Sequence, residues 1–272
     1  MEKSLKFFLS LSLFWGACSN HTPPQDDELS MVYLDSAQHN YQGSVKNMTY
    51  LMKSVAHDST NAEAYRELSI PYLKRGYPHL WFPLIAKTIR EDPSWCGYRG
   101  CNYLFFYRDY ERALADFRAT DTLTPGFTDF PQAMSVKYLK GLCFLGLEQY
   151  DSALFHFQSY IDEDSLKYGL EWVDQRVFLY RAVVQNRLKN YTTALRETRK
   201  GLSIFNQSAD LNYHKAIAHM HLNQIDSARL CTDLAMKYFD MGYFHSQAYT
   251  EVQEQIYRSD IEELRLALNR PL

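Results

Sequence analysis

One sequence pattern occurs twice between Leu188 and Asp240, and the spacing of the two copies restricts the fold more than any other feature of the chain. The copies read LKNYTTALRETRKGL and HLNQIDSARLCTDLAM, with Ala194 and Ala228 in equivalent places 34 residues apart. A small residue that recurs at a fixed place in a two-helix unit marks a point where two helix backbones approach closely. A period of this length predicts stacked helical hairpins.

The same spacing extends toward the N-terminus with two insertions. Ala113 and Ala153 are 40 residues apart, and Ala153 and Ala194 are 41 apart, which is one period plus six and seven residues. We expect the second insertion to lie between Asp164 and Trp172, as a longer helix or a loop. With 15% aromatic residues but only 11 Gly and 9 Pro, the composition also favours helices over a turn-rich β fold.

These units resemble tetratricopeptide repeats (TPRs). The family places small residues and aromatics at set positions of a 34-residue helical pair. The matching residues are Gly141, Tyr150, Ala153 and Phe157 in one unit, Ala182, Tyr191 and Ala194 in the next, and Ala216, Ala228 and Ala235 in the third. Thr198 and Thr232 stand where an aromatic is usual, and Trp81 where Ala is usual. The resemblance covers residues 31–245 and implies an all-α fold, a right-handed α-solenoid of about six TPR-like helical hairpins plus a C-terminal capping helix, within residues 31–270.

The predicted cap runs from Ser246 to Arg270. It carries Val252, Ile256 and Tyr257 on one side and charged residues on the other, and Ser259 stands three places before Glu262 as in a capping box. A solenoid end needs a polar outer face to stay soluble, and this segment is predicted to supply it as a helix.

The first residues predict export and a lipid anchor. Lys3 and Lys6 precede an apolar run that ends at Trp15, too short to span a bilayer, and small residues lead to Cys18. The tetrapeptide WGAC resembles the lipobox of bacterial lipoproteins, as in Bacteroidota, which implies a signal peptide over residues 1–17 and lipidation of Cys18. Residues 18–30 are polar and are expected to form a flexible tether. The alternative is an ordinary signal peptide with an incidental cysteine.

In TPR proteins the first helices line the concave surface, so the resemblance implies a set of protein-binding candidates. These candidates are Trp95, Tyr98, Arg99, Asn102, Tyr138, Tyr180, Arg187, Tyr213, His214 and His221. Tyr and Arg carry much of the binding energy at protein surfaces. The alternative is that these aromatics form the core between units, because aromatic residues dominate cores and interfaces alike. No carboxylate clamp is predicted.

Other kinds of site find little support. A net charge of −3 without a basic run argues against nucleic acid. His214, His219 and His221 do not converge with a carboxylate or Cys, so no metal site is predicted. We expect Cys96, Cys101, Cys143 and Cys231 to be buried free thiols. The alternative is a Cys96–Cys101 bridge, which requires a break in the helix at Gly97 and Gly100.

No nucleophile elbow, phosphate loop or set of zinc ligands is found, so we predict neither an enzyme nor a cofactor. The chain is interpreted as a non-catalytic scaffold, lipid-anchored in a bacterial cell envelope, with the outer membrane favoured, that docks a protein or peptide. An outer-membrane assembly adaptor and a surface glycan-capture lipoprotein are the alternatives, and an enzyme is the third.

Overall fold

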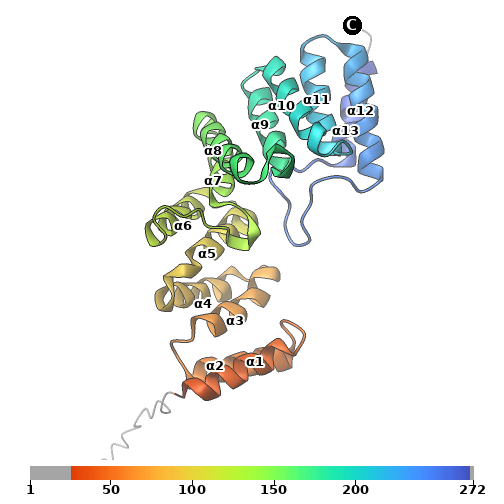
Figure 1. The fold of residues 1–272 in the computed structure, drawn as a ribbon. Helices are drawn as coiled ribbons and strands as arrows, with labels where there is room; N and C mark the ends of the chain where they lie inside the picture. The colour runs from red at the N-terminus through yellow and green to blue at the C-terminus, as the bar shows by residue number, and fades with distance from the viewer. Residues whose placement is uncertain (1–25, 270–272) are drawn as a thin grey trace, which may run out of the picture. The chain divides into compact units, whose positions relative to one another are not determined.

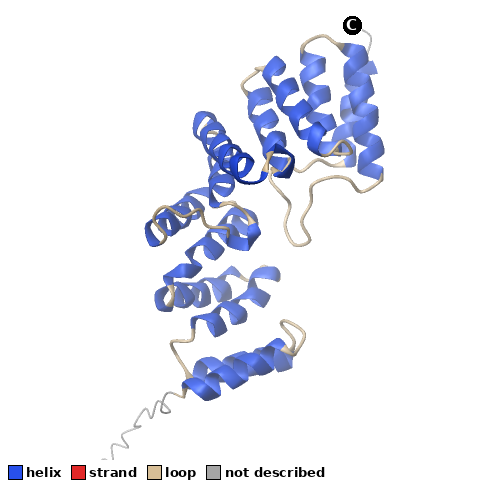
Figure 2. Ribbon diagram, viewed as in Figure 1, coloured by secondary structure: helices blue, strands red, loops and turns tan. Residues whose placement is uncertain are grey.

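The computed structural model describes residues 26–269, and every regular element in that range is helical (Figure 2). Its α-helices follow one another along the chain (Figure 1): α1 (Asp27–Gln38), α2 (Val45–His57), α3 (Ala62–Lys74), α4 (Pro78–Glu91), α5 (Cys96–Asn102), α6 (Tyr110–Leu123), α7 (Val136–Gly146), α8 (Tyr150–Tyr168), α9 (Arg176–Arg187), α10 (Tyr191–Ile204), α11 (Ala209–His221), α12 (Ile225–Asp240) and α13 (Arg258–Asn269). Within this range the predicted fold class is confirmed, as six helical hairpins and one further helix.

The chain divides into two compact units, and the boundary between Leu68 and Ser69 falls inside α3. In the first unit α1 packs on α2 through two serines that are fully buried, Ser30 and Ser54. Each serine hydroxyl donates to the other's backbone carbonyl at 2.9 Å. Small polar residues thus let the two helices approach closely without leaving a buried hydroxyl unpaired. Helix α1 begins at Asp27, inside the segment predicted as a tether.

The second unit begins inside α3 and includes α4 to α13. Helix pairs α5/α6, α7/α8, α9/α10 and α11/α12 each pack as hairpins, and α7, α9 and α11 also contact one another in sequence. The first helices of the last three hairpins therefore form one continuous row.

The residues that defined the repeat are buried where the helices meet. Ala113, Ala153, Ala194 and Ala228 are all 0% exposed. In α7, a Cβ at Gly141 would lie 2.4 Å from the Phe157 ring of α8, so a larger residue requires that ring to move. The close approach predicted from the spacing is confirmed.

Every hairpin has one residue with left-handed backbone at the same place in the turn between its helices. These residues have φ between 53° and 77° and recur every 32–41 positions: Gly43, Gly76, Arg108, Glu148, Lys189 and Asn223. A left-handed residue other than glycine costs roughly 1–2 kcal/mol. The hairpin geometry therefore overrides local preference at four of the six turns.

The two insertions fall outside the helix crossings. The second lengthens α8 to 19 residues and adds a short turn, Leu170–Trp172, as the spacing predicts. The first forms the connection between α6 and α7, which includes the turn Pro131–Ala133.

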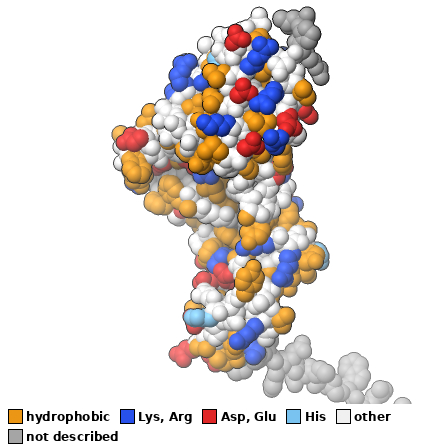
Figure 3. All heavy atoms as spheres, turned by 90° about the vertical axis from the view of Figure 1, so that its right-hand side faces the viewer, with side chains coloured by type: hydrophobic (Ala, Val, Ile, Leu, Met, Phe, Trp, Pro, Cys, Tyr) orange, Lys and Arg blue, Asp and Glu red, His pale blue; other side chains and the backbone are white. Residues whose placement is uncertain are grey.

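The predicted C-terminal cap is only partly right. Helix α13 begins at Arg258, and residues 242–257, here named the strap, contain no helix. Helix α13 does pack on α12, with ion pairs from Arg258 to Asp240 at 3.2 Å and from Arg265 to Asp233 at 2.6 Å. Charges of both signs are interspersed over this end of the molecule (Figure 3). The polar outer face is present, but only half of the predicted segment builds it.

Candidate interaction surface

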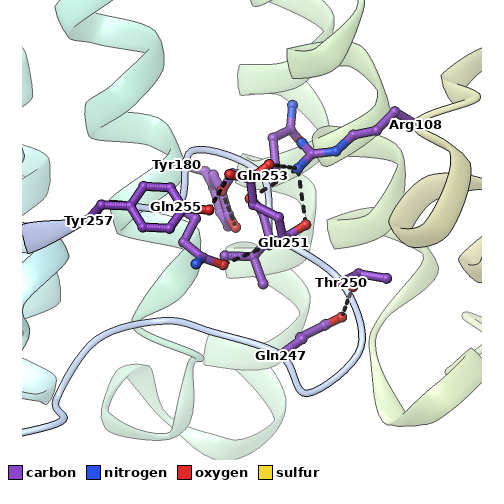
Figure 4. Close-up of polar contacts among 9 residues, drawn as sticks. Arg108, Tyr180, Gln247, Thr250, Glu251, Gln253, Gln255 and Tyr257 are labelled. Atoms are coloured by element: carbon purple, nitrogen blue, oxygen red, sulfur yellow. Dashed lines mark hydrogen bonds and ion pairs between the residues drawn. The ribbon is translucent and has the colours of Figure 1, made fainter. Parts of the chain in front are cut away.

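The strap crosses the row of first helices. It contacts α7, α9, the start of α11 and the turn before α6, and we call the surface that it touches the inner face. Figure 4 shows the contacts of the strap with Arg108 and Tyr180. Its first anchor is at α11, where Ala209 N donates to Tyr243 O and His245 N donates to Asp210 Oδ2, both at 2.9 Å. A non-helical segment is thereby held on the helical surface where the resemblance implies ligand binding.

Three consecutive backbone carbonyls of the strap accept hydrogen bonds from inner-face side chains (Figure 4). Arg108 donates to Glu251 O at 3.0 Å and to Val252 O at 3.3 Å, and Tyr180 OH donates to Gln253 O at 3.1 Å. Main-chain contacts of this kind hold a segment in place whatever its side chains are. The inner face therefore has the groups needed to hold an extended peptide.

Side chains of the strap add specific contacts. In the orientation that satisfies both of its ends, the Gln253 amide donates to Leu142 O at 3.1 Å and accepts from Gly146 N at 3.0 Å. Glu254 pairs with Arg187 at 2.5 Å, and Glu251 pairs with Arg108 at 3.2 Å. Val252 is only 2% exposed. The inner face therefore accommodates residues 251–254, in which an apolar residue and an amide residue stand between two acids.

His245 joins the strap to α9 through two hydrogen bonds. The single hydroxyl hydrogen of Tyr180 goes to Gln253 O, so His245 Nδ1, 3.2 Å away, is the donor to the tyrosine oxygen. Its Nε2 is then an acceptor 3.5 Å from the Arg176 guanidinium. Burial, and next the charge of Arg176, lower the pKa of His245 to about 4. The imidazole is therefore neutral near pH 7, in the tautomer that this network requires.

The predicted binding residues fall into three groups. Asn102, Tyr138, Tyr180 and His214 are buried, between 1% and 7% exposed, and are not available as open surface contacts in this conformation. Tyr138 and Tyr180 belong to the main core, with ring centres 6.1 Å apart, because the space between units is filled by aromatics. The Tyr180 hydroxyl does reach the inner face, where the strap covers it.

Two predicted arginines are held in ion pairs. Arg99 makes a bidentate contact with the buried Asp116, at 2.8 and 2.7 Å, so it serves the packing of α5 on α6. Arg187 binds the strap through Glu254. The last group keeps some exposure: Trp95, Tyr98 and Tyr213 are half-buried, and His221 is exposed and stacks on Tyr191 at 4.5 Å. Tyr180 and Arg187 are brought together at the strap. Trp95, in the short 3-10 helix Pro93–Trp95, instead pairs with Tyr98 on α5, with ring centres 5.9 Å apart.

Several residues of this surface were not predicted. Arg108, His245, Gln253 and Glu254 all take part in strap contacts. Arg108 and Glu251 are 143 residues apart in sequence, so no local pattern connects them. The one available signal is the polar, non-repeating composition of residues 242–257.

Buried polar groups near α11 predict a pH-dependent stability. His214 is 7% exposed and neither ring nitrogen has a hydrogen-bond partner among the described residues. Burial, with a smaller contribution from Arg187, lowers the pKa of His214 to about 4. The neutral form is favoured in the folded state, so this contribution to stability is complete above pH 6.5 and is lost as the pH falls toward 4.

Between pH 7 and pH 5, the unfolding free energy of the wild type should fall by about 2 kcal/mol more than that of His214→Leu. The reason is that one pKa unit corresponds to about 1.4 kcal/mol. Urea unfolding of both proteins at the two pH values measures the difference. Burial raises the pKa of Asp210 to about 6, which acts in the opposite direction but is common to both proteins. Equal pH dependence in the two proteins would contradict the assignment.

Within residues 26–269 there is no group of three or more His, Cys, Asp or Glu side chains placed to hold a metal ion. No helix in the same range is long and apolar enough to cross a membrane. The four cysteines described there, Cys96, Cys101, Cys143 and Cys231, are buried free thiols, and burial raises the pKa of each. Cys18 and the predicted signal segment lie outside the described residues.

No protein-family model and no curated protein sequence matches the chain. Solved structures do match it. PilF from Pseudomonas aeruginosa aligns with a TM-score of 0.57 at 18% identity, over 79% of this chain and 93% of PilF. PilW, described as a widely conserved type IV pilus biogenesis factor, gives 0.61 at 12% identity, over 79% and 96%. A tetratricopeptide repeat protein from Parabacteroides merdae gives 0.54 at 15% identity, over 89% and 83%.

The fold is that of TPR proteins. At these identities the likeness concerns the fold alone, and it agrees with the helix pairing and with the buried alanines. The departure at Trp81, which is 0% exposed, is accommodated within the same TPR arrangement.

Proposed function

We propose that the protein is a non-catalytic scaffold, lipid-anchored at Cys18 in a bacterial cell envelope, that docks a protein segment on its inner face. The observation that carries this proposal is the row of side-chain donors that hold three consecutive backbone carbonyls of the strap. A surface that binds main-chain groups is suited to a peptide, whereas a glycan offers no such carbonyl series.

Two further observations support a docking role. His221 is exposed at the end of α11, and Trp95 and Tyr98 are half-buried just before and on α5, so the first hairpin helices also carry aromatic surface apart from the strap contacts described above. PilW, which shares the fold, is described as a pilus biogenesis factor, which supports a part in assembling envelope machinery.

Photo-crosslinking in intact cells tests both parts of this proposal. A benzophenone amino acid replaces Trp95 or His221 in the full chain, and Phe155, 66% exposed on α8, is the matched control on a second helix. We expect Trp95 and His221 to crosslink to one and the same protein in the membrane fraction, and Phe155 not to do so. With Cys18→Ala, the chain should leave that fraction.

Two results would contradict the proposal. Equal crosslinking from Phe155 would show that docking is not confined to the first helices, and membrane retention of Cys18→Ala would remove the lipid anchor. Retention of the purified chain on polysaccharide, with no protein crosslink, would favour glycan capture instead.

A further inference from the structure

We infer that the strap is an exchangeable occupant of the inner face, and that the docked partner is an extended protein segment with the same chemistry. That chemistry is a β-branched apolar residue followed by an amide residue, with acids on both sides, as in Glu251–Glu254. The inference rests on the proposed docking function and names the kind of segment that the site takes.

Charge complementarity defines the first part of this chemistry. The inner face presents the guanidinium groups of Arg108 and Arg187 to the strap, and each is matched by a strap carboxylate. These pairs lie at the edge of the contact, where the Arg side chains are 36% and 38% exposed. Pairs with this exposure contribute little to stability but select the charge and register of a bound segment.

The centre of the contact is apolar and desolvated. Val252 is 2% exposed and Gln253 is 9% exposed, and the Gln253 amide is satisfied by two backbone groups of α7 that lie one helical turn apart. A partner without an amide at this place would lose both of these contacts with α7. The amide position therefore favours a partner with Gln at this place.

The strap itself has features of a replaceable ligand. It contains no helix, and Glu254 is held at φ +57°, a left-handed conformation that is unfavourable for a non-glycine residue. Helices α7, α9 and α11 pack on one another and on their own hairpin partners without using strap residues. Release of the strap is therefore compatible with an intact row of hairpins.

Space beside the strap also favours an external partner. A pocket of about 320 Å³ at the strap tip is lined by Leu73, Phe105, Phe106 and Arg108 together with Tyr249 and Thr250 of the strap. The strap places the small Thr250 immediately before Glu251 and does not fill this pocket. A partner with a larger apolar residue there would gain contacts that the strap lacks.

A peptide-binding measurement on the full chain tests the inference. A labelled synthetic peptide with the sequence of residues 246–257 is titrated by fluorescence anisotropy against wild type and against Val252→Asp, which places a charge at the buried centre of the strap. We expect the Val252→Asp protein to bind the peptide at least about tenfold more tightly than wild type, because a closed strap lowers apparent affinity by the open fraction.

The matched control is Ala248→Asp, which adds the same charge at an exposed strap position and should behave as wild type. A second release variant, Glu251→Lys with Glu254→Lys, reverses charges at the edge of the contact without touching a buried group. On the inner face of a release variant, Arg108→Met should weaken peptide binding about tenfold, as expected for losing hydrogen bonds from a charged donor.

The inference is overturned if both release variants keep their helical circular dichroism and bind the peptide no better than wild type. This outcome is distinguishable from failure of the docking function. If the peptide does not bind but Trp95 and His221 still crosslink to a protein, docking stands and the strap inference falls. If the peptide binds and no protein is crosslinked, the strap inference stands and docking of a cellular protein falls.

Discussion

Replacing Trp81 with alanine should lower the free energy of unfolding by about 3–5 kcal/mol, the range for removing a large aromatic from a packed core. Trp81 is 0% exposed on α4, and its ring centre lies 5.1 Å from that of Tyr107 and 5.7 Å from that of Tyr103. Those tyrosines come from a π-helical turn, Tyr103–Tyr107, that follows α5. The substitution introduces the residue that TPR units usually have at this position. It should still destabilise the protein, because the neighbouring tyrosine rings pack against the indole and its removal leaves a cavity.

Urea unfolding followed by circular dichroism measures this effect. Trp172→Ala is the matched control, because that side chain is 74% exposed and its loss should change stability by no more than about 0.5 kcal/mol. A similar small change for Trp81→Ala would show that the aromatic cluster is not a stabilising core.

Replacing Arg181 with methionine should destabilise by a comparable amount, about 3–5 kcal/mol, because it leaves a buried carboxylate without its main partner. Arg181 on α9 donates to Glu197 on α10 at 2.9 and 3.3 Å, and the glutamate side chain is only 1% exposed. Lys200 lies 3.8 Å from the same carboxylate but is 46% exposed, so it offsets only part of the loss.

The double variant Arg181→Met with Glu197→Leu separates a broken ion pair from a general loss of packing. Replacing both members of a buried pair by apolar residues is often neutral or stabilising. We therefore expect the double variant to recover most of the lost stability in the same unfolding measurement. If the double variant is as unstable as Arg181→Met, the damage lies in packing and not in the uncompensated charge.

The repeat architecture was predictable because it depends on residue size at fixed intervals. Alanines at 113, 153, 194 and 228 are buried wherever helices cross, and the insertion before Trp172 lengthened α8 without changing the crossings. Close packing imposes the same volume limit in every unit, so a spacing of small residues carries the information. The last four of the described hairpins follow from it.

The strap was not predictable because its conformation depends on contacts with residues far away in sequence and not on a repeated spacing. Val252 and Ile256 are four residues apart and fit one stripe of a helix, but they are buried at 2% and 3% exposure in a segment without helix. Two apolar residues at one helical interval do not distinguish a helix from an irregular segment held by tertiary contacts. The partners that decide the matter, Arg108 and Tyr180, lie far away in sequence.

The candidate site shows the same limit at the level of single residues. Tyr138 and Tyr180 were predicted by their place on first helices, and both are on those helices, but sequence position does not tell which side chains face the neighbouring unit. Tyr180 has two roles: its ring packs in the core, and its hydroxyl donates to the strap. A residue of this kind is assigned correctly only when the covering segment is known.

Both ends of the strap are covalently joined to folded helices, α12 before it and α13 after it. A tethered ligand of this length competes at an effective concentration in the millimolar range. A dilute partner with equal intrinsic affinity would rarely displace it, whereas partners crowded into a two-dimensional layer reach comparable local densities. If the strap is exchangeable, as inferred above, the loop between two helices sets a threshold, and the proposed scaffold responds to the local density of its partners more than to their number in the cell.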